Sequence, residues 1–200
     1  MNNYDAMQEA ARLRFLEYDP ATLAGKPGIA DGGDHLQTCF LGRQVRIQKQ
    51  DGCILLDGRA AGFGESLSIY DWLCDSRAGA VPAGEYCALG SLPGIYVGGG
   101  NLSIEMPRLA RAIQSDPQHF RRICGEMGGR EVALADLTVC LPIFPNLPLY
   151  LKFYFADEEF PPQLTPLWDR NMLQFVRYET VYYIAGCLQE YLLRRMDETI

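Results

Sequence analysis

The sequence predicts an α+β fold, with an antiparallel or mixed sheet and helices packed mainly on one side of it. Apolar residues recur at helical spacing near both ends of the chain and in its middle, and strand-like runs lie between these segments. Asp51-Gly52 separates two such runs, and this dipeptide indicates an antiparallel hairpin because both turn positions accept positive φ. A length of 200 residues suits one core, so we predict a single domain over residues 1–200.

The first predicted elements are a helix and a connection. A helix is expected over residues 3–18, because apolar side chains there recur mostly every three or four positions: Ala6, Met7, Ala10, Leu13 and Leu16. Asp19-Pro20 is expected to end this helix. Residues 21–33 contain four glycines and a proline, so they are expected to form a surface loop.

A hairpin and a helix make up the next segment. The hairpin strands are predicted at residues 42–50, where apolar and polar side chains alternate, and at residues 53–56. A short helix over residues 66–76 is expected to pack on this hairpin, with the Ser66 hydroxyl capping its first turn. Residues 81–89 are predicted to form a further strand.

Two helices are predicted in the middle of the chain. The first covers residues 103–115, although Pro107 is tolerated best near a first helical turn, which favours a later start. Asp116-Pro117 is typical of an N-cap followed by proline at the first helical position. The helix that it opens is expected to end at Gly128-Gly129.

The last third of the chain predicts two strands and a long helix. Strands are expected at residues 131–143 and 148–156, and the second is rich in aromatic side chains, which favours a central position in the sheet. The helix over residues 179–196 carries one apolar stripe, formed by Val181, Ile184, Ala185, Leu188 and Leu192. We expect this stripe to pack on the strand from Leu149 to Phe155.

Composition indicates which classes of partner and which cellular compartment to expect for this chain. The net charge of −7 provides no positive field for nucleic acid or anionic membrane surfaces, so neither is expected as a partner. No apolar run approaches the roughly 20 residues that span a bilayer, and the N-terminus has no signal-peptide pattern, so we predict a cytoplasmic protein. The seven cysteines are scattered without a C-x-x-C motif, which favours packing over metal binding.

Asp157, Glu158 and Glu159 form an acidic cluster directly after the aromatic strand. Together with Asp169 they are candidate ligand-binding residues, since adjacent carboxylates can bind a hard cation or act as an acid and base pair. A solvated turn is the simpler alternative for the cluster.

A glycine run forms the second candidate site, at the end of the turn-rich residues 92–101. Gly99 and Gly100 precede a predicted helix, where free backbone N–H groups can bind an anion, and Arg108 would add positive charge. The run lacks the G-x-G-x-x-G and G-K-[ST] patterns of nucleotide-binding loops. A surface turn with a solubilising arginine is the alternative.

The two histidines provide little support for catalysis. His35 lies in a predicted loop and His119 on a predicted helix, and neither lies near a motif that exposes a nucleophile. We therefore name no catalytic residue and no metal ligand, and we assign no cofactor.

Several segments resemble a prokaryotic domain-of-unknown-function family, number 3786. Its pattern is similar to the residues around Asp157-Glu158-Glu159-Phe160, with Pro148-Leu149-Tyr150-Leu151 before them and Leu167-Trp168-Asp169 after them. Earlier segments agree in order: Asp19-Pro20, Gly42-Arg43-Gln44-Val45-Arg46, the stretch Tyr70 to Leu92, and Gly128-Gly129. The resemblance thus covers nearly the whole chain. It departs at Glu85-Tyr86-Cys87-Ala88, where the family pattern has a Trp-led strand.

The resemblance implies an uncharacterised protein of anaerobic bacteria and archaea. Some family members carry an added iron–sulphur-cluster domain, like those on corrinoid proteins of one-carbon metabolism. This chain has no clustered cysteines, so an iron–sulphur cluster or corrinoid would belong to a protein partner. We predict a non-catalytic binding or accessory module for such metabolism. The alternative is a small-molecule enzyme with an acidic cleft around Asp157 to Glu159.

Overall fold

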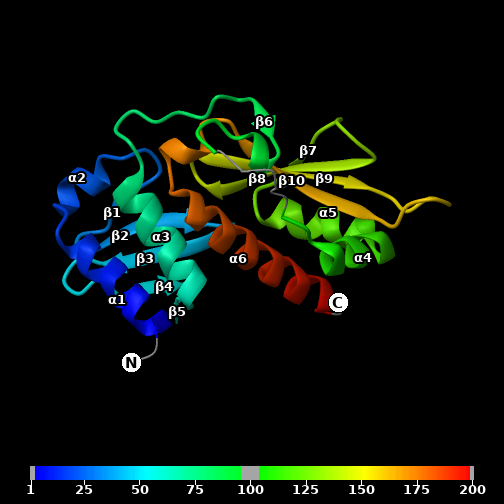
Figure 1. Ribbon diagram of the computed structural model, residues 1–200. Helices are drawn as coiled ribbons and strands as arrows, with labels where there is room; N and C mark the ends of the chain where they lie inside the picture. The colour runs from blue at the N-terminus through cyan, green and yellow to red at the C-terminus, as the bar shows by residue number, and fades with distance from the viewer. Residues whose placement is uncertain (1–2, 96–103, 199–200) are drawn as a thin grey trace.

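Two antiparallel sheets form the framework of the described chain, which covers residues 3–95 and 104–198 of this computed structural model (Figure 1). The first sheet has the order β1-β2-β3-β4-β5, with β1 (Ala30–Asp31), β2 (His35–Phe40), β3 (Arg43–Gln48), β4 (Ile54–Leu56) and β5 (Arg59–Ala60). The second has the order β6-β10-β9-β8-β7, with β6 (Tyr86–Cys87), β7 (Arg130–Glu131), β8 (Leu137–Phe144), β9 (Leu147–Tyr154) and β10 (Gln163–Asp169). The α+β class and the antiparallel pairing are confirmed, but the strands form two sheets where one was expected.

The helices pack on these sheets in two groups joined by the last helix. They are α1 (Asn3–Leu16), α2 (Pro20–Ala24), α3 (Phe63–Asp75), α4 (Pro107–Ser115), α5 (Pro117–Glu126) and α6 (Tyr178–Asp197), with 3-10 turns at Leu89–Ser91 and Met172–Gln174. In Figure 1, α1 and α3 lie over the first sheet, while α4 and α5 lie beside the second. The long α6 runs between the groups and contacts α3, α4 and α5. None of the described helices is both long and apolar enough to cross a membrane.

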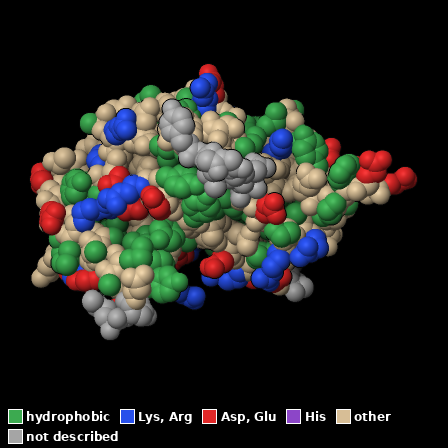
Figure 2. All heavy atoms as spheres, in the orientation of Figure 1, with side chains coloured by type: hydrophobic (Ala, Val, Ile, Leu, Met, Phe, Trp, Pro, Cys, Tyr) green, Lys and Arg blue, Asp and Glu red, His purple; other side chains and the backbone are tan. Residues whose placement is uncertain are grey.

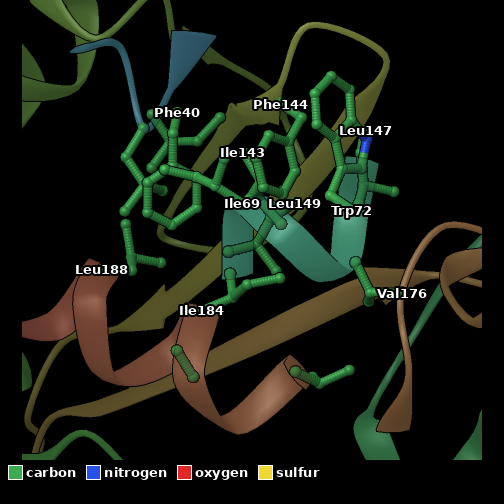
Figure 3. Close-up of a cluster of buried hydrophobic side chains, with 14 of the residues drawn as sticks. Phe40, Ile69, Trp72, Ile143, Phe144, Leu147, Leu149, Val176, Ile184 and Leu188 are labelled. Carbon is green, nitrogen blue, oxygen red and sulfur yellow. The ribbon is translucent and has the colours of Figure 1, made fainter. Parts of the chain in front are cut away.

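One core of buried side chains continues through both sheets. Trp72 of α3 stacks on Phe144 of β8, with ring centroids 4.3 Å apart. The backbone N–H of Leu41, between β2 and β3, donates to the Ile143 carbonyl of β8 at 2.8 Å, which ties the first sheet to the second. Figure 3 shows Phe40 and Ile143 in the same cluster as Trp72 and Phe144.

The apolar stripe of α6 is buried along its whole length, as predicted. The expected partner was the strand from Leu149 to Phe155. Leu149 does lie in the cluster that contains Ile184 and Leu188 (Figure 3), but α3 is the main neighbour of α6. The strand β9 is central in its sheet, as predicted, and only its alternate residues are fully buried.

The clearest local signals of the sequence are confirmed. The hairpin of β3 and β4 pairs antiparallel across the turn that contains Asp51-Gly52. Asp116 caps α5, because its carboxylate accepts a hydrogen bond from the His119 backbone N–H at 2.8 Å. The following helix end places Gly128 at φ 81°, a conformation that favours glycine. Helix α4 begins at Pro107, the later start that its proline favours.

Two elements in the first third differ from the prediction. The expected loop 21–33 contains the short helix α2, because the Asp19 carboxylate accepts from the Ala21 N–H at 3.2 Å and Pro20 supplies a preset φ. His35 was placed in a loop but begins β2, which pairs along its length with β3. The buried face of β2 includes the polar Thr38 and its exposed face includes Cys39, so the alternation of apolar and polar residues that indicates a strand is irregular here.

Helix α3 and three strand segments also differ from the prediction. Helix α3 begins at Phe63, so Ser66 lies inside it and is no cap. Only Tyr86–Cys87 of the expected strand 81–89 is paired, and the expected strand 131–143 is interrupted between β7 and β8. The sequence did not predict β10, because Pro166 lies within it and proline is depleted in strands.

Candidate ligand-binding site

The acidic cluster after β9 forms a hydrogen-bonded turn. The Asp157 carboxylate accepts from the backbone N–H groups of Glu159 and Phe160, both at 2.8 Å, and these bonds lower the pKa of Asp157. The side chains of Glu158 and Glu159 are exposed. The carboxylate of Asp157 is therefore occupied by the backbone of the residues that follow it. This arrangement is typical of a solvated turn, the simpler alternative to a ligand site.

Asp169 lies at the opposite end of β10 and is fully buried. Its carboxylate accepts three backbone hydrogen bonds, from Ala83 at 2.9 Å, from Gly84 at 2.8 Å and from Asn171 at 2.8 Å. It therefore fixes the segment that precedes β6 against the end of β10. The structure does not bring it together with Asp157, Glu158 or Glu159. Within residues 3–95 and 104–198, no group of three or more His, Cys, Asp and Glu side chains could hold a metal ion.

The glycine-run candidate is only partly covered by the described residues. Gly99 and Gly100 lie outside them. Arg108 is the second residue of α4 and its side chain is exposed. Exposure leaves this arginine able to bind an anion or to act only as a solubilising surface group.

A cavity of about 620 Å³ lies between the first turn of α3 and the face of α6 beside its buried stripe. In Figure 2 the lower edge of the molecule is notched between these helices, with acidic and basic side chains on the rim. Its α6 wall has two rows of residues spaced four apart, which therefore lie on neighbouring lines of the helix: Tyr183, Cys187 and Tyr191, and Tyr182, Gly186, Glu190 and Arg194. The opposite wall is formed by residues 62–65 and by Arg43.

Aromatic rings form the apolar part of this cavity. Phe63 packs edge-on against Tyr183, with ring centroids 5.6 Å apart, and against Tyr4 at 5.0 Å. The hydroxyl of Tyr182 is hydrogen-bonded to that of Tyr178 at 2.7 Å, and this bond raises the pKa of Tyr182 to about 12. These contacts hold the rings of Phe63, Tyr183 and Tyr182 in their orientations.

Two glycines shape the cavity, each in a different way. A Cβ atom built on Gly186 would meet nothing within 4 Å, so the absent side chain leaves space at the α6 wall. At Gly64 a Cβ would lie 3.0 Å from the Cys187 sulphur, so α3 and α6 approach closely there. Glycine at position 64 therefore sets the spacing of the helices, and glycine at position 186 sets the width of the cavity.

Arg43, the first residue of β3, is the charged group at the base of the cavity. Its Nη1 pairs with Glu65 Oε1 at 2.7 Å, and its side chain is only 11% exposed. Glu65 Oε2 accepts from the Gly62 N–H at 2.8 Å, so the same carboxylate caps α3. Among the described residues, Arg43 Nε and Nη2 are buried and have no hydrogen-bond partner.

Three guanidinium groups surround the ring of Tyr191. Their central carbons lie 4.7 Å from the ring centroid for Arg43, 5.3 Å for Arg194 and 5.9 Å for Arg195. Arg195 also donates to the Tyr191 hydroxyl and pairs with Glu126 and Glu198. No ion pair of Arg194 occurs within the described part of the chain. The rim of the cavity therefore has an arginine without an ion-pair partner, Arg194, and an exposed carboxylate, Glu190.

The cysteine of the cavity is held as a thiol. Burial raises the pKa of Cys187 to about 12, and the nearby carboxylates of Glu65 and Glu190 act in the same direction. The thiolate is the reactive form of cysteine, so this side chain is an unreactive part of the wall at neutral pH.

The amino-acid sequence did not predict this site. Its residues come from β3, α3 and α6, which lie far apart along the chain. One signal was present in the last helix, where Gly186 interrupts a helical pattern that has tyrosines at 182, 183 and 191. A glycine inside a helix costs stability, which points to a packing or functional reason for its presence.

A comparison with protein families places the chain in a family. A family model described as Domain of unknown function (DUF3786) matches residues 19–191. That range contains the cavity-lining residues from Arg43 to Tyr191. No curated protein and no solved structure matches the chain.

Proposed function

Because the chain belongs to the DUF3786 family, whose description names no activity, we propose its function from its own geometry: it is a binding module that holds a small organic ligand between α3 and α6. The observation that carries this proposal is the cavity of about 620 Å³ lined by aromatic rings. Ligand sites commonly have about 300–1,000 Å³, apolar and aromatic walls, and a few polar groups that fix orientation.

The chemistry of the lining residues supports binding over catalysis. The described wall contains no histidine, serine or threonine, and its cysteine is held as a thiol. His35 is bonded to Asp34 on the first sheet, and His119 lies on α5. The described cavity walls therefore contain no Ser-His or Cys-His pair of nucleophile and base.

Filling the cavity provides the test of this proposal. We expect Gly186→Trp to weaken the binding of single-ring compounds at least about tenfold, because an indole at this open position occupies the cavity. Binding is measured by ligand-detected NMR with a library that contains anionic, neutral and cationic single-ring compounds. The circular dichroism spectrum is expected to stay unchanged, since no atom lies close to the new Cβ.

The matched control is Gly125→Trp, a change at an exposed glycine of α5 that also has open space around it. This variant is expected to bind the same compounds as the original chain. If no compound binds the original chain, or if the two tryptophan variants lose binding equally, the cavity is not a ligand site.

Two finer predictions remain proposals, and the first of them rests on the family resemblance. One is an accessory role, in the cytoplasm, for a partner that carries an iron–sulphur cluster or a corrinoid. Affinity purification from the native host is expected to recover such a partner, and recovery of none above background would contradict the role. The other is a small-molecule enzyme with an acidic cleft around Asp157 to Glu159, which rests on the acidic residues after β9; Asp169 lies at the opposite end of β10 from them.

A further inference from the structure

We infer that the ligand carries an anionic group, a carboxylate or a phosphate, on an apolar or aromatic body, and that Arg43 binds this group. The inference deepens the proposed function and rests on it. Three features of the cavity carry it: an arginine with two unpaired nitrogens, an unpaired arginine at the rim, and a corner that already holds a carboxylate.

The first feature is the incomplete hydrogen bonding of Arg43. Buried polar groups are nearly always paired, and an unpaired charged donor is especially unfavourable. Glu65 occupies only Nη1, which leaves Nε and Nη2 without a partner among the described residues. These two nitrogens form one edge of the guanidinium, and this edge matches two oxygens of a carboxylate or phosphate.

The Tyr191 ring covers a face of the Arg43 guanidinium and not that edge. The guanidinium of Arg43 lies over the ring, at 4.7 Å from its centroid, and such stacking occupies the face of the group while leaving its edges free. Nε and Nη2 are buried, so binding a ligand with them requires the guanidinium to turn on the ring toward the cavity.

The second feature is the positive charge at the rim. Arg194 lies over the same ring, is exposed, and has no ion pair in the described residues. Glu190 also lines the cavity and opposes an anion. Its side chain is exposed, so solvent weakens its effect relative to that of the buried Arg43.

The third feature is the Glu65 corner at the start of α3. One carboxylate there is bonded to Arg43 and to the Gly62 N–H at the same time. The first N–H groups of a helix carry partial positive charge, and Gly64 adds no side chain over them. The corner thus shows that this guanidinium and this helix start bind a carboxylate, and the Glu65 carboxylate occupies Arg43 Nη1 and the Gly62 N–H.

The experiment compares four single-ring probes by calorimetry: benzoate, phenyl phosphate, benzyl alcohol and benzylamine. We expect benzoate or phenyl phosphate to bind at least about tenfold more tightly than benzyl alcohol. One charge-assisted hydrogen bond is sufficient for a tenfold difference in affinity. The better of the two anions identifies the group as carboxylate or phosphate. Equal binding of the anionic, neutral and cationic probes would overturn the inference.

Variants assign the effect to Arg43. Arg43→Gln is expected to weaken the preferred anion about 10- to 100-fold and to change benzyl alcohol binding less than about twofold. Since the buried pair with Glu65 also supports the fold, exposed positions provide a second measurement. Arg194→Gln is expected to weaken the anion, and Glu190→Gln to strengthen it, each by about two- to fivefold.

The matched control is Arg108→Gln, which removes the same charge from an exposed position on α4 outside the cavity wall. It is expected to leave anion binding unchanged. If benzyl alcohol binds and Gly186→Trp blocks it, while Arg43→Gln and Arg194→Gln change nothing, the anion inference fails and the proposed function stands. If no probe binds, both fail.

Discussion

Replacing Asp169 with alanine is expected to lower the free energy of unfolding by about 3 kcal/mol or more, since its buried carboxylate accepts three hydrogen bonds and a hydrogen bond to a charged group contributes about 1.5–3 kcal/mol. The carboxylate is fully buried and accepts from the N–H groups of Ala83, Gly84 and Asn171. Alanine would leave all three donors without this acceptor and release the segment before β6. Urea denaturation followed by circular dichroism measures the loss.

The control for this prediction is Asp157→Ala. That carboxylate also accepts two backbone hydrogen bonds, but it is exposed, so water can replace it and the loss should stay below about 1 kcal/mol. Asp169→Asn keeps one acceptor oxygen and is expected to fall between these values. Equal losses for the two alanine variants would show that the Asp169 bonds are not important for stability.

Local chemistry explains which parts of the fold were predictable. Asp116-Pro117, Gly128-Gly129 and Asp51-Gly52 act on the backbone of their own neighbours, so their structural effect can be inferred from a few adjacent residues. The elements that were missed depend on distant partners. β2 is fixed by pairing with β3, and β10 forms beside β9 despite its internal proline.

The candidate site depends on distant partners even more than the missed strands do. Asp157 and Asp169 are close in sequence, yet a whole strand separates them. Arg43 and Tyr191 are far apart in sequence, yet the guanidinium of one lies over the ring of the other. Sequence proximity suggested the first pair as a site, whereas only the packing of α6 beside α3 brings the second pair together.

The packing of α6 leads to the second large stability prediction. We expect Leu188→Ala to lower the free energy of unfolding by about 2–5 kcal/mol, the range for a fully buried leucine that leaves a cavity. Leu188 is fully buried in the cluster that includes Phe40, Ile143 and Ile184 (Figure 3). Thermal and urea unfolding of the variant measure the loss.

Gly186→Ala tests helix propensity in α6, whereas Leu188→Ala tests packing in the same helix. Its new methyl group meets nothing within 4 Å, and alanine is favoured over glycine inside a helix by about 0.5–1 kcal/mol, so this variant should be more stable than the original chain. The two changes, two positions apart on α6, should therefore have opposite signs. A loss below about 1 kcal/mol for Leu188→Ala would contradict the buried contact of α6 with the core. Destabilisation by Gly186→Ala would show that the cavity wall has no room for a side chain, which would also argue against an open binding site there.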